Sequence, residues 1–175
     1  MNYKYNIALS YESQQEKLVE KAYHYLKAEK LSVFFAPSPE CQIYLSGRNQ
    51  REAFYDIFGK KAEYVALFVS STYLAAAVPM EEAHIAYATH IPDKIIPIYL
   101  EAAELPKELL NPKEINYFKA NDPAVIANHI AKRVREDMGT ATNTLESDKS
   151  KTQFIIEGNI AEKQVFVQSL GSINL

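Results

Sequence analysis

Val65–Leu74, with the sequence Val-Ala-Leu-Phe-Val-Ser-Ser-Thr-Tyr-Leu, is the most informative stretch of the chain. Its first five residues form an unbroken apolar run with β-branched and aromatic members, and hydroxyl residues follow directly. Such a run is typical of a strand buried on both faces of a parallel sheet. Ligands bind at the carboxyl ends of strands in sheets of this kind. We therefore expect a functional site just after Val69.

Strand and helix patterns alternate along the rest of the chain. The predicted strands are Tyr5–Tyr11, Leu31–Phe35, the central run from Val65, Lys94–Leu100 and Ile115–Phe118. Helical apolar spacing lies between them, at residues 18–26, at residues 51–58 before Gly59, and from Pro79 onward. This alternation requires right-handed crossovers and helices on both faces of a sheet. We predict an α/β fold with a doubly wound, five-stranded parallel sheet.

Prolines mark the boundaries of two segments near the expected site. Residues 36–49 contain Pro37 and Pro39 near their start and are predicted to form a long loop, and loops of this length are commonly functional. Pro79 is predicted to open the helix after the central strand. This start places Glu81 and Glu82 in the first turn of that helix, beside the expected ligand.

The character of the chain changes after its last predicted helix. Asn121 and Asp122 supply an N-cap before Pro123, and the helix is expected to close near Gly139. We assign residues 1–138 to one domain and residues 139–152, which are small and polar, to a flexible linker. Residues 153–175 contain three short β-prone runs separated by turn signals. They are predicted to form a β-hairpin that either packs on its own domain or promotes oligomerisation.

Composition excludes several classes of partner. The net charge is −3 and the pI is near 5.8, so no general attraction to nucleic acid or to an anionic membrane is expected. The single cysteine, Cys41, cannot form an internal disulfide. The first residues lack a signal-peptide core, and no apolar run is long enough to span a bilayer. We expect a cytoplasmic protein that binds no metal.

Several motifs together resemble the Toll/interleukin-1 receptor (TIR) domain, and its bacterial branch in particular, over about Asn2 to Asp137. The matching segments are Ile7–Tyr11, the variable segment after Phe35, Phe68–Leu74, Ile95–Ile98 and Glu104–Pro106. In that family an acid follows the tyrosine of a Ser-x-x-Tyr-Leu motif by nine residues, as Glu82 follows Tyr73. The resemblance implies the flavodoxin-like sheet of TIR domains.

The chain departs from the family pattern at two places. Val78-Pro79 stand where members commonly have Trp-Cys, and Ala36-Pro37 stand where an acid usually follows the second strand. TIR domains include enzymes that cleave NAD at the nicotinamide–ribose bond and scaffolds that only assemble. The resemblance is therefore compatible with an enzyme or with a scaffold. The chemistry that Glu82 itself can perform must decide between them.

Glu82 is the candidate catalytic residue. Loss of nicotinamide from NAD leaves positive charge on the ribose, and a carboxylate beneath the sugar stabilises that charge. The alternative is that Glu81 and Glu82 only complement the positive end of their helix. The two roles are compatible, with Glu81 as the dipole partner and Glu82 as the active-site acid.

Residues that follow the strands are candidates for substrate binding. Ser10, Tyr11 and Glu12 follow the first strand, and Ser70 and Ser71 follow the third. Arg48 and Arg51 are candidates to contact a pyrophosphate from the long segment. The chain lacks a Gly-x-Gly-x-x-Gly motif, so we expect no bound cofactor and NAD as a substrate.

Three hypotheses for function follow from the resemblance and the acid. In the first, the protein is an NAD hydrolase or ADP-ribosyl cyclase that works after self-assembly, as an antiphage effector or signal generator. In the second, it is a scaffold that acts only through TIR–TIR contacts. The third, a nucleoside deoxyribosyltransferase, also uses a glutamate beneath a ribose but takes free nucleosides.

Overall fold

The structure is a computed structural model that describes residues 3–90, 92–103, 105–106, 109 and 117–138. The chain divides into two units, residues 1–134 and 135–175, and the sheet lies wholly in the first. The predicted linker at residues 139–152 and β element at residues 153–175 lie outside the described residues, as does the predicted helix end near Gly139. These assignments, and the predicted domain boundary after residue 138, stay predictions.

Within the described residues, five parallel strands form one sheet in the order β2-β1-β3-β4-β5. The strands are β1 (Tyr5–Ser10), β2 (Val33–Phe34), β3 (Ala62–Val69), β4 (Ile95–Tyr99) and β5 (Phe118–Lys119). Every residue of β3 except Glu63 is buried, as its apolar run predicts. The doubly wound, five-stranded parallel sheet is therefore confirmed.

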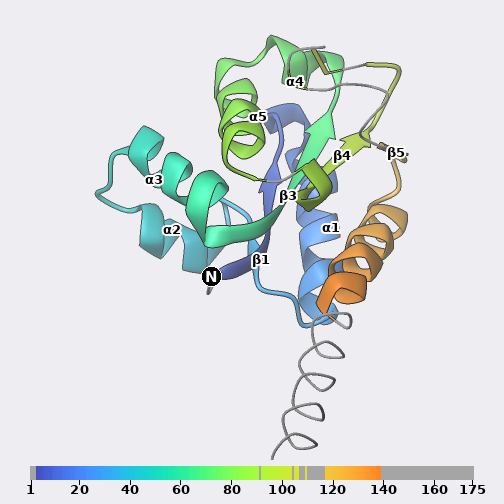
Figure 1. Cartoon of the computed structure of the whole chain (residues 1–175), viewed down its shortest axis with the longest axis horizontal. Helices are drawn as coiled ribbons and strands as arrows, with labels where there is room; N and C mark the ends of the chain where they lie inside the picture. The colour runs from blue at the N-terminus through green and yellow to red at the C-terminus, as the bar shows by residue number, and fades with distance from the viewer. Residues whose placement is uncertain (1–2, 91, 104, 107–108, 110–116, 139–175) are drawn as a thin grey trace, which may run out of the picture. The chain divides into compact units, whose positions relative to one another are not determined.

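Helices cover both faces of this sheet (Figure 1). They are α1 (Glu16–Ala28), α2 (Pro39–Leu45), α3 (Gln50–Asp56), α4 (Ser71–Ala75) and α5 (Ala77–Thr89), with a further helix from residue 123. Three short helical segments complete the list: η1 (Ser13–Gln15), η2 (Ile57–Lys61) and η3 (Pro92–Lys94).

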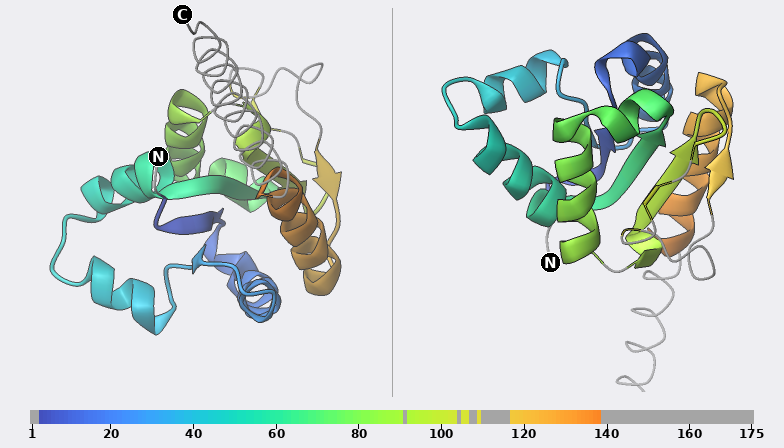
Figure 2. Two further views of the ribbon diagram at one scale, coloured as in Figure 1. Left: turned by 60° about the horizontal axis from the view of Figure 1, so that its bottom comes forward. Right: turned by 90° about the horizontal axis from the view of Figure 1, so that it is seen from above.

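Alternate residues of each strand pack into two separate cores. Ile7 and Tyr64 face α1 and the last described helix, which contributes Ile126, Ile130 and Val134. Figure 2 shows these two helices side by side. The expected N-cap of the last helix is present, because Asp122 Oδ1 accepts a hydrogen bond of 2.9 Å from the Val125 N–H.

The opposite face of the sheet carries the helices that matter for the site. Ala8, Val65 and Leu67 of the strands pack there against α2, η2, α4 and α5. Side chains alternate between faces along a strand, so Ser10 points to the same face as Ala8. Ser10 is the last residue of β1 and is fully buried. The carboxyl end of β1 therefore places a hydroxyl under the helices of this face.

The predicted loop at residues 36–49 is wrong, because α2 occupies much of it. Ser38 is the N-cap of α2, and its hydroxyl accepts a hydrogen bond of 3.4 Å from the Cys41 N–H. Pro39 is the first helical residue, where a missing N–H removes no helical hydrogen bond. The proline that predicts irregular structure instead starts a helix.

Two further helix boundaries differ from the prediction. Helix α5 begins at Ala77 rather than Pro79, so Glu81 and Glu82 lie in its second turn, beyond the strongest part of the helix dipole. Gly59 does not end a helix but lies within η2, where a Cβ would come within 3.3 Å of Ile85 on α5. Gly59 therefore permits close packing of η2 against α5.

Candidate functional site

The site is centred on the carboxyl group of Glu82. Glu82 lies on α5 and is buried, with 7% of the residue exposed. The Ser10 hydroxyl lies 2.6 Å from Glu82 Oε2. A buried carboxyl requires such a partner, because leaving it without a hydrogen bond costs free energy of folding. Ser10 therefore fixes the acid at the carboxyl end of the central strands.

Tyr73 extends this contact into α4. Its hydroxyl oxygen lies 2.8 Å from Ser10 Oγ, and its O–H donates a hydrogen bond of 3.0 Å to the carbonyl oxygen of Pro79. Ser70 caps α4 by accepting a hydrogen bond of 3.1 Å from the Tyr73 N–H. The cap holds the tyrosine in place, and the tyrosine joins the start of α5 to the end of β1.

The surroundings of Glu82 favour its neutral form. Burial is the main reason that the pKa of this carboxyl rises to about 8, against an ordinary value of 4.5. The hydrogen bond from Ser10 lowers the pKa, and the nearby charge of Glu81 raises it. A pKa this far from the ordinary value is common for catalytic carboxyl groups.

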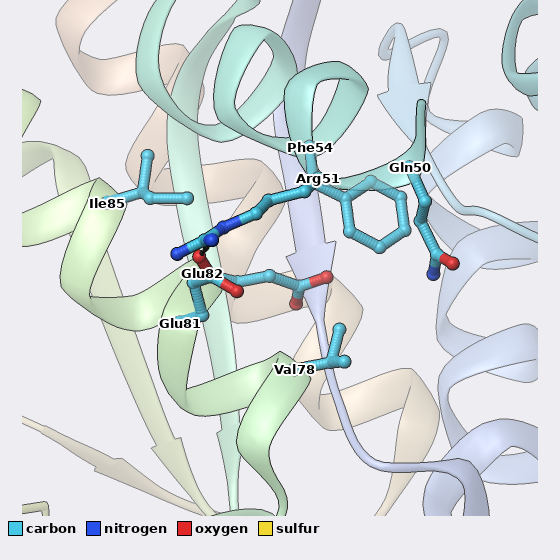
Figure 3. Close-up of a pocket in the computed structure, with 7 residues that line it drawn as sticks. All are labelled: Gln50, Arg51, Phe54, Val78, Glu81, Glu82 and Ile85. Atoms are coloured by element: carbon cyan, nitrogen blue, oxygen red, sulfur yellow. Dashed lines mark hydrogen bonds and ion pairs between the residues drawn. The ribbon is translucent and has the colours of Figure 1, made fainter. Parts of the chain in front are cut away.

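Two cavities meet at Glu82. The first has a volume of about 180 Å³ and is lined by Gln50, Arg51, Phe54, Val78, Glu81, Glu82 and Ile85 (Figure 3). The second has a volume of about 290 Å³ and lies toward β1 and η1, where Tyr11, Glu12 and Glu16 contribute to its lining. Phe54 and Val78 line both cavities. Glu82 is thus reachable from two sides even though its side chain is buried.

Arg51 reaches from α3 to the mouth of the first cavity, as Figure 3 shows. Its Nε donates a hydrogen bond of 2.6 Å to Glu81 Oε1. The Arg51 side chain is 81% exposed, and an ion pair this open to water adds little to stability. A ligand with negative charge has little stabilisation to overcome in order to displace Glu81 from Arg51.

The structure brings some of the predicted substrate-binding residues to Glu82. Ser10 contacts it directly, while Tyr11 and Glu12 line the second cavity. Tyr11 also stacks on Phe35, with ring centroids 5.6 Å apart, so it has a packing role.

The other predicted residues line neither cavity. Ser70 is the cap of α4, and the Ser71 N–H donates to Glu101 Oε1. Arg48 stacks on Tyr44, with its guanidinium 4.5 Å from the ring centre, and lines a different cavity. A role for these three residues in substrate binding stays a prediction.

Sequence reasoning missed two groups that shape the site. Tyr73 served only to count the interval to Glu82, and its position in a run of apolar and small residues predicts ordinary packing. Phe54 gives no signal of its own in the sequence.

Among the described residues, no group of three His, Cys, Asp or Glu side chains is placed to hold a metal ion, and no helix is long and apolar enough to cross a membrane.

The raised pKa of Glu82 predicts a specific pH dependence of stability. The folded protein keeps the Glu82 proton between about pH 4.5 and pH 8, whereas the unfolded chain has lost it. The free energy of unfolding of the wild type should therefore fall as pH rises through this range. Glu82→Gln has no carboxyl group at this position, so its free energy of unfolding should lack this decline. The decline is on the order of a few kcal/mol, because each pKa unit corresponds to about 1.4 kcal/mol.

Urea unfolding at a series of pH values checks this prediction. Glu81→Gln is the matched control and should keep the decline of the wild type. An unfolding free energy with the same pH dependence in the wild type and in Glu82→Gln would contradict the assignment of the raised pKa to Glu82.

Comparison with known proteins identifies the family. The profile of the TIR domain matches residues 7–139. A 3′ cyclic ADP-D-ribose synthase of Aquimarina amphilecti is 35% identical over 72 residues, which are 41% of this chain and 21% of that protein's length. The TIR domain of the Toll-related receptor TRR-2 from Hydra magnipapillata superposes with a TM-score of 0.59 at 15% identity, covering 75% of this chain and 98% of that one.

A TIR-STING receptor from C. gigas gives a TM-score of 0.60 at 14% identity, covering 75% of this chain and 40% of that one. At such identities the solved structures show a shared fold. The sequence resemblance, the sheet order and the family profile agree. The chain belongs to the TIR domain family.

Proposed function

We propose that this TIR domain cleaves NAD at the bond between nicotinamide and ribose, with Glu82 as the carboxylate that stabilises the ribosyl cation. The observation that carries the proposal is the buried Glu82 carboxyl, held by Ser10 at the point where two cavities meet. The partial similarity to a 3′ cyclic ADP-D-ribose synthase supports it. A 3′ cyclic ADP-ribose is what NAD leaves behind when nicotinamide departs and a ribose hydroxyl of the same molecule closes the ring.

The chemistry requires a negative charge at a fixed place. As the glycosidic bond breaks, its electron pair leaves with nicotinamide and the ribose becomes an oxocarbenium-like cation. A carboxylate that is already in position stabilises this cation without reorganising in the transition state. Water then attacks to give ADP-ribose, or a hydroxyl of the bound molecule attacks to give a cyclic product.

The space beside Glu82 suggests how NAD lies. The first cavity, at about 180 Å³, is smaller than a usual ligand pocket of roughly 300–1,000 Å³. It shares Arg51, Glu81 and Ile85 with a groove of about 590 Å³ between α3 and α5. We place the nicotinamide riboside end against Glu82 and the diphosphate at Arg51, with Lys60 further along the groove.

The first prediction from this proposal concerns the two neighbouring acids. Purified protein at high concentration should release nicotinamide from NAD. Glu82→Gln should lower the rate at least ~100-fold, as expected for loss of a group that stabilises transition-state charge. Glu81→Gln, the adjacent and more exposed acid, should cost much less. Nicotinamide release is followed by chromatography, and circular dichroism confirms that both variants fold.

Two outcomes would contradict the proposal. Equal rates in the wild type and a folded Glu82→Gln would remove the role of this acid. Base exchange between free deoxynucleosides, with no release of nicotinamide from NAD, would identify a deoxyribosyltransferase instead. Whether the protein is an antiphage effector or a signal generator stays a prediction.

We further propose that cleavage depends on self-association through residues 36–49. Ile43 of helix α2 is 80% exposed, more than any other large apolar residue that the structure describes. Ala36 of the same segment lines the second cavity beside Glu82. A neighbouring molecule that docks on this segment would cover the cavity and exclude water from it.

The second prediction tests this dependence. The rate per molecule should rise with protein concentration in the wild type, and Ile43→Asp should abolish the rise by placing a charge in the contact. Val125→Asp, at an apolar residue that is 49% exposed on the helix from residue 123, is the control and should behave as the wild type. A rate per molecule that is flat over a wide dilution series, with a monomer throughout by light scattering, would rule out the dependence.

A further inference from the structure

Three buried hydrogen-bond contacts run in series from Glu82. Glu82 Oε2 lies 2.6 Å from Ser10 Oγ, Ser10 Oγ lies 2.8 Å from the Tyr73 hydroxyl, and the Tyr73 hydroxyl lies 3.0 Å from the Pro79 carbonyl oxygen. Ser10 and Tyr73 are fully buried. The series ends on a carbonyl oxygen, which can only accept a hydrogen bond.

An ionised Glu82 leaves this series one hydrogen short. Ser10 and Tyr73 each carry one hydroxyl hydrogen, so two hydrogens are available for three contacts. If Ser10 donates to Glu82 and Tyr73 donates to Pro79, the oxygens of Ser10 and Tyr73 face each other with no hydrogen between them. Such an unmatched contact is costly where water cannot reach it.

A protonated Glu82 supplies the missing hydrogen. The acid then donates to Ser10, Ser10 donates to Tyr73, and Tyr73 donates to the Pro79 carbonyl. Every contact has one donor and one acceptor, and all hydrogens point the same way. All three contacts can therefore be hydrogen bonds at the same time only when Glu82 is neutral.

We propose that Tyr73, through its contact with Ser10, controls the protonation of Glu82 and favours the neutral acid in the resting domain, whereas the Ser10 hydroxyl stabilises the carboxylate once it turns to donate to it. Ionisation requires the Ser10 hydroxyl to turn round and donate to the carboxylate, with loss of one contact to Tyr73. The consequence for catalysis rests on the proposed function, because stabilising a ribosyl cation needs the carboxylate. Ser10 and Tyr73 are positioning residues in this account, since they act through Glu82.

The charged groups around Glu82 are mostly acidic. The charged and titratable groups that share its cavities or neighbour it are Glu81 on α5, Arg51 on α3, Tyr11 after β1, Glu12 before η1 and Glu16 on α1. Arg51 is the one cation among these described residues and is paired with Glu81. The balance favours the uncharged form, in agreement with the raised pKa of Glu82.

Titration of the Glu82 carboxyl carbon by NMR, in protein with ¹³C-labelled glutamate and no NAD, tests the proposal. Loss of one signal in Glu82→Gln assigns the resonance. Tyr73→Phe frees the Ser10 hydrogen for the carboxylate, so the pKa of Glu82 should fall by about one pH unit. Ser10→Ala removes the donor to the carboxylate, so the pKa should rise. Tyr64→Phe, in the other core, is the control and should leave the pKa unchanged.

Shifts in opposite directions for Tyr73→Phe and Ser10→Ala support the hydrogen count, because general loosening of the fold would move both pKa values the same way. A Glu82 pKa that is unchanged or raised in Tyr73→Phe would overturn the proposal, as would a pKa that is unchanged or lowered in Ser10→Ala. The titration is made without substrate. If the protein fails to cleave NAD, the proposed function is refuted, but the pKa shifts measured by NMR still test the control of Glu82 protonation.

Discussion

The contact between Ser10 and Glu82 is the interaction on which the site depends. It joins the last residue of β1 to the second turn of α5, and so fixes the helix that forms one wall of both cavities. The contact is possible because Ser10 shares a sheet face with the apolar residues that pack against α5. A carboxyl buried at this depth has a raised pKa, so the same contact sets both the geometry and the charge of the site.

Tyr73 explains why the interval to Glu82 matters physically. Helix α4 ends after Ala75, and the extended backbone of Ala76 turns the chain into α5. Tyr73 binds the Pro79 carbonyl across this turn and also reaches Ser10. A residue nine positions after Tyr73 lies on the next helix, one turn beyond Pro79 and close to the same serine. The spacing therefore follows from a turn between two helices that the tyrosine holds together.

Much of the sheet and the central acid could be predicted from the sequence. Unbroken apolar runs such as the one in β3 leave few alternatives to a buried parallel strand, and family spacing singles out Glu82. Helix α2 was missed because Ser38-Pro39 is compatible with either a loop or a capped helix, and tertiary packing of Cys41 decides between them. The contacts of Tyr73 and the position of Phe54 beside Glu82 depend on how α3, α4 and α5 pack together. Local sequence patterns do not predict such packing.

The pH dependence of NAD cleavage tests the central claim most directly, since the account requires the carboxylate form of an acid that rests neutral. The measurement is the initial rate of nicotinamide release by the wild type across pH 5 to 9.5, at a protein concentration where the rate per molecule no longer rises. The account predicts a rate that increases with pH and whose midpoint coincides with the NMR midpoint of the Glu82 carboxyl. A rate that is independent of pH across that midpoint, or that falls as Glu82 ionises, would contradict it.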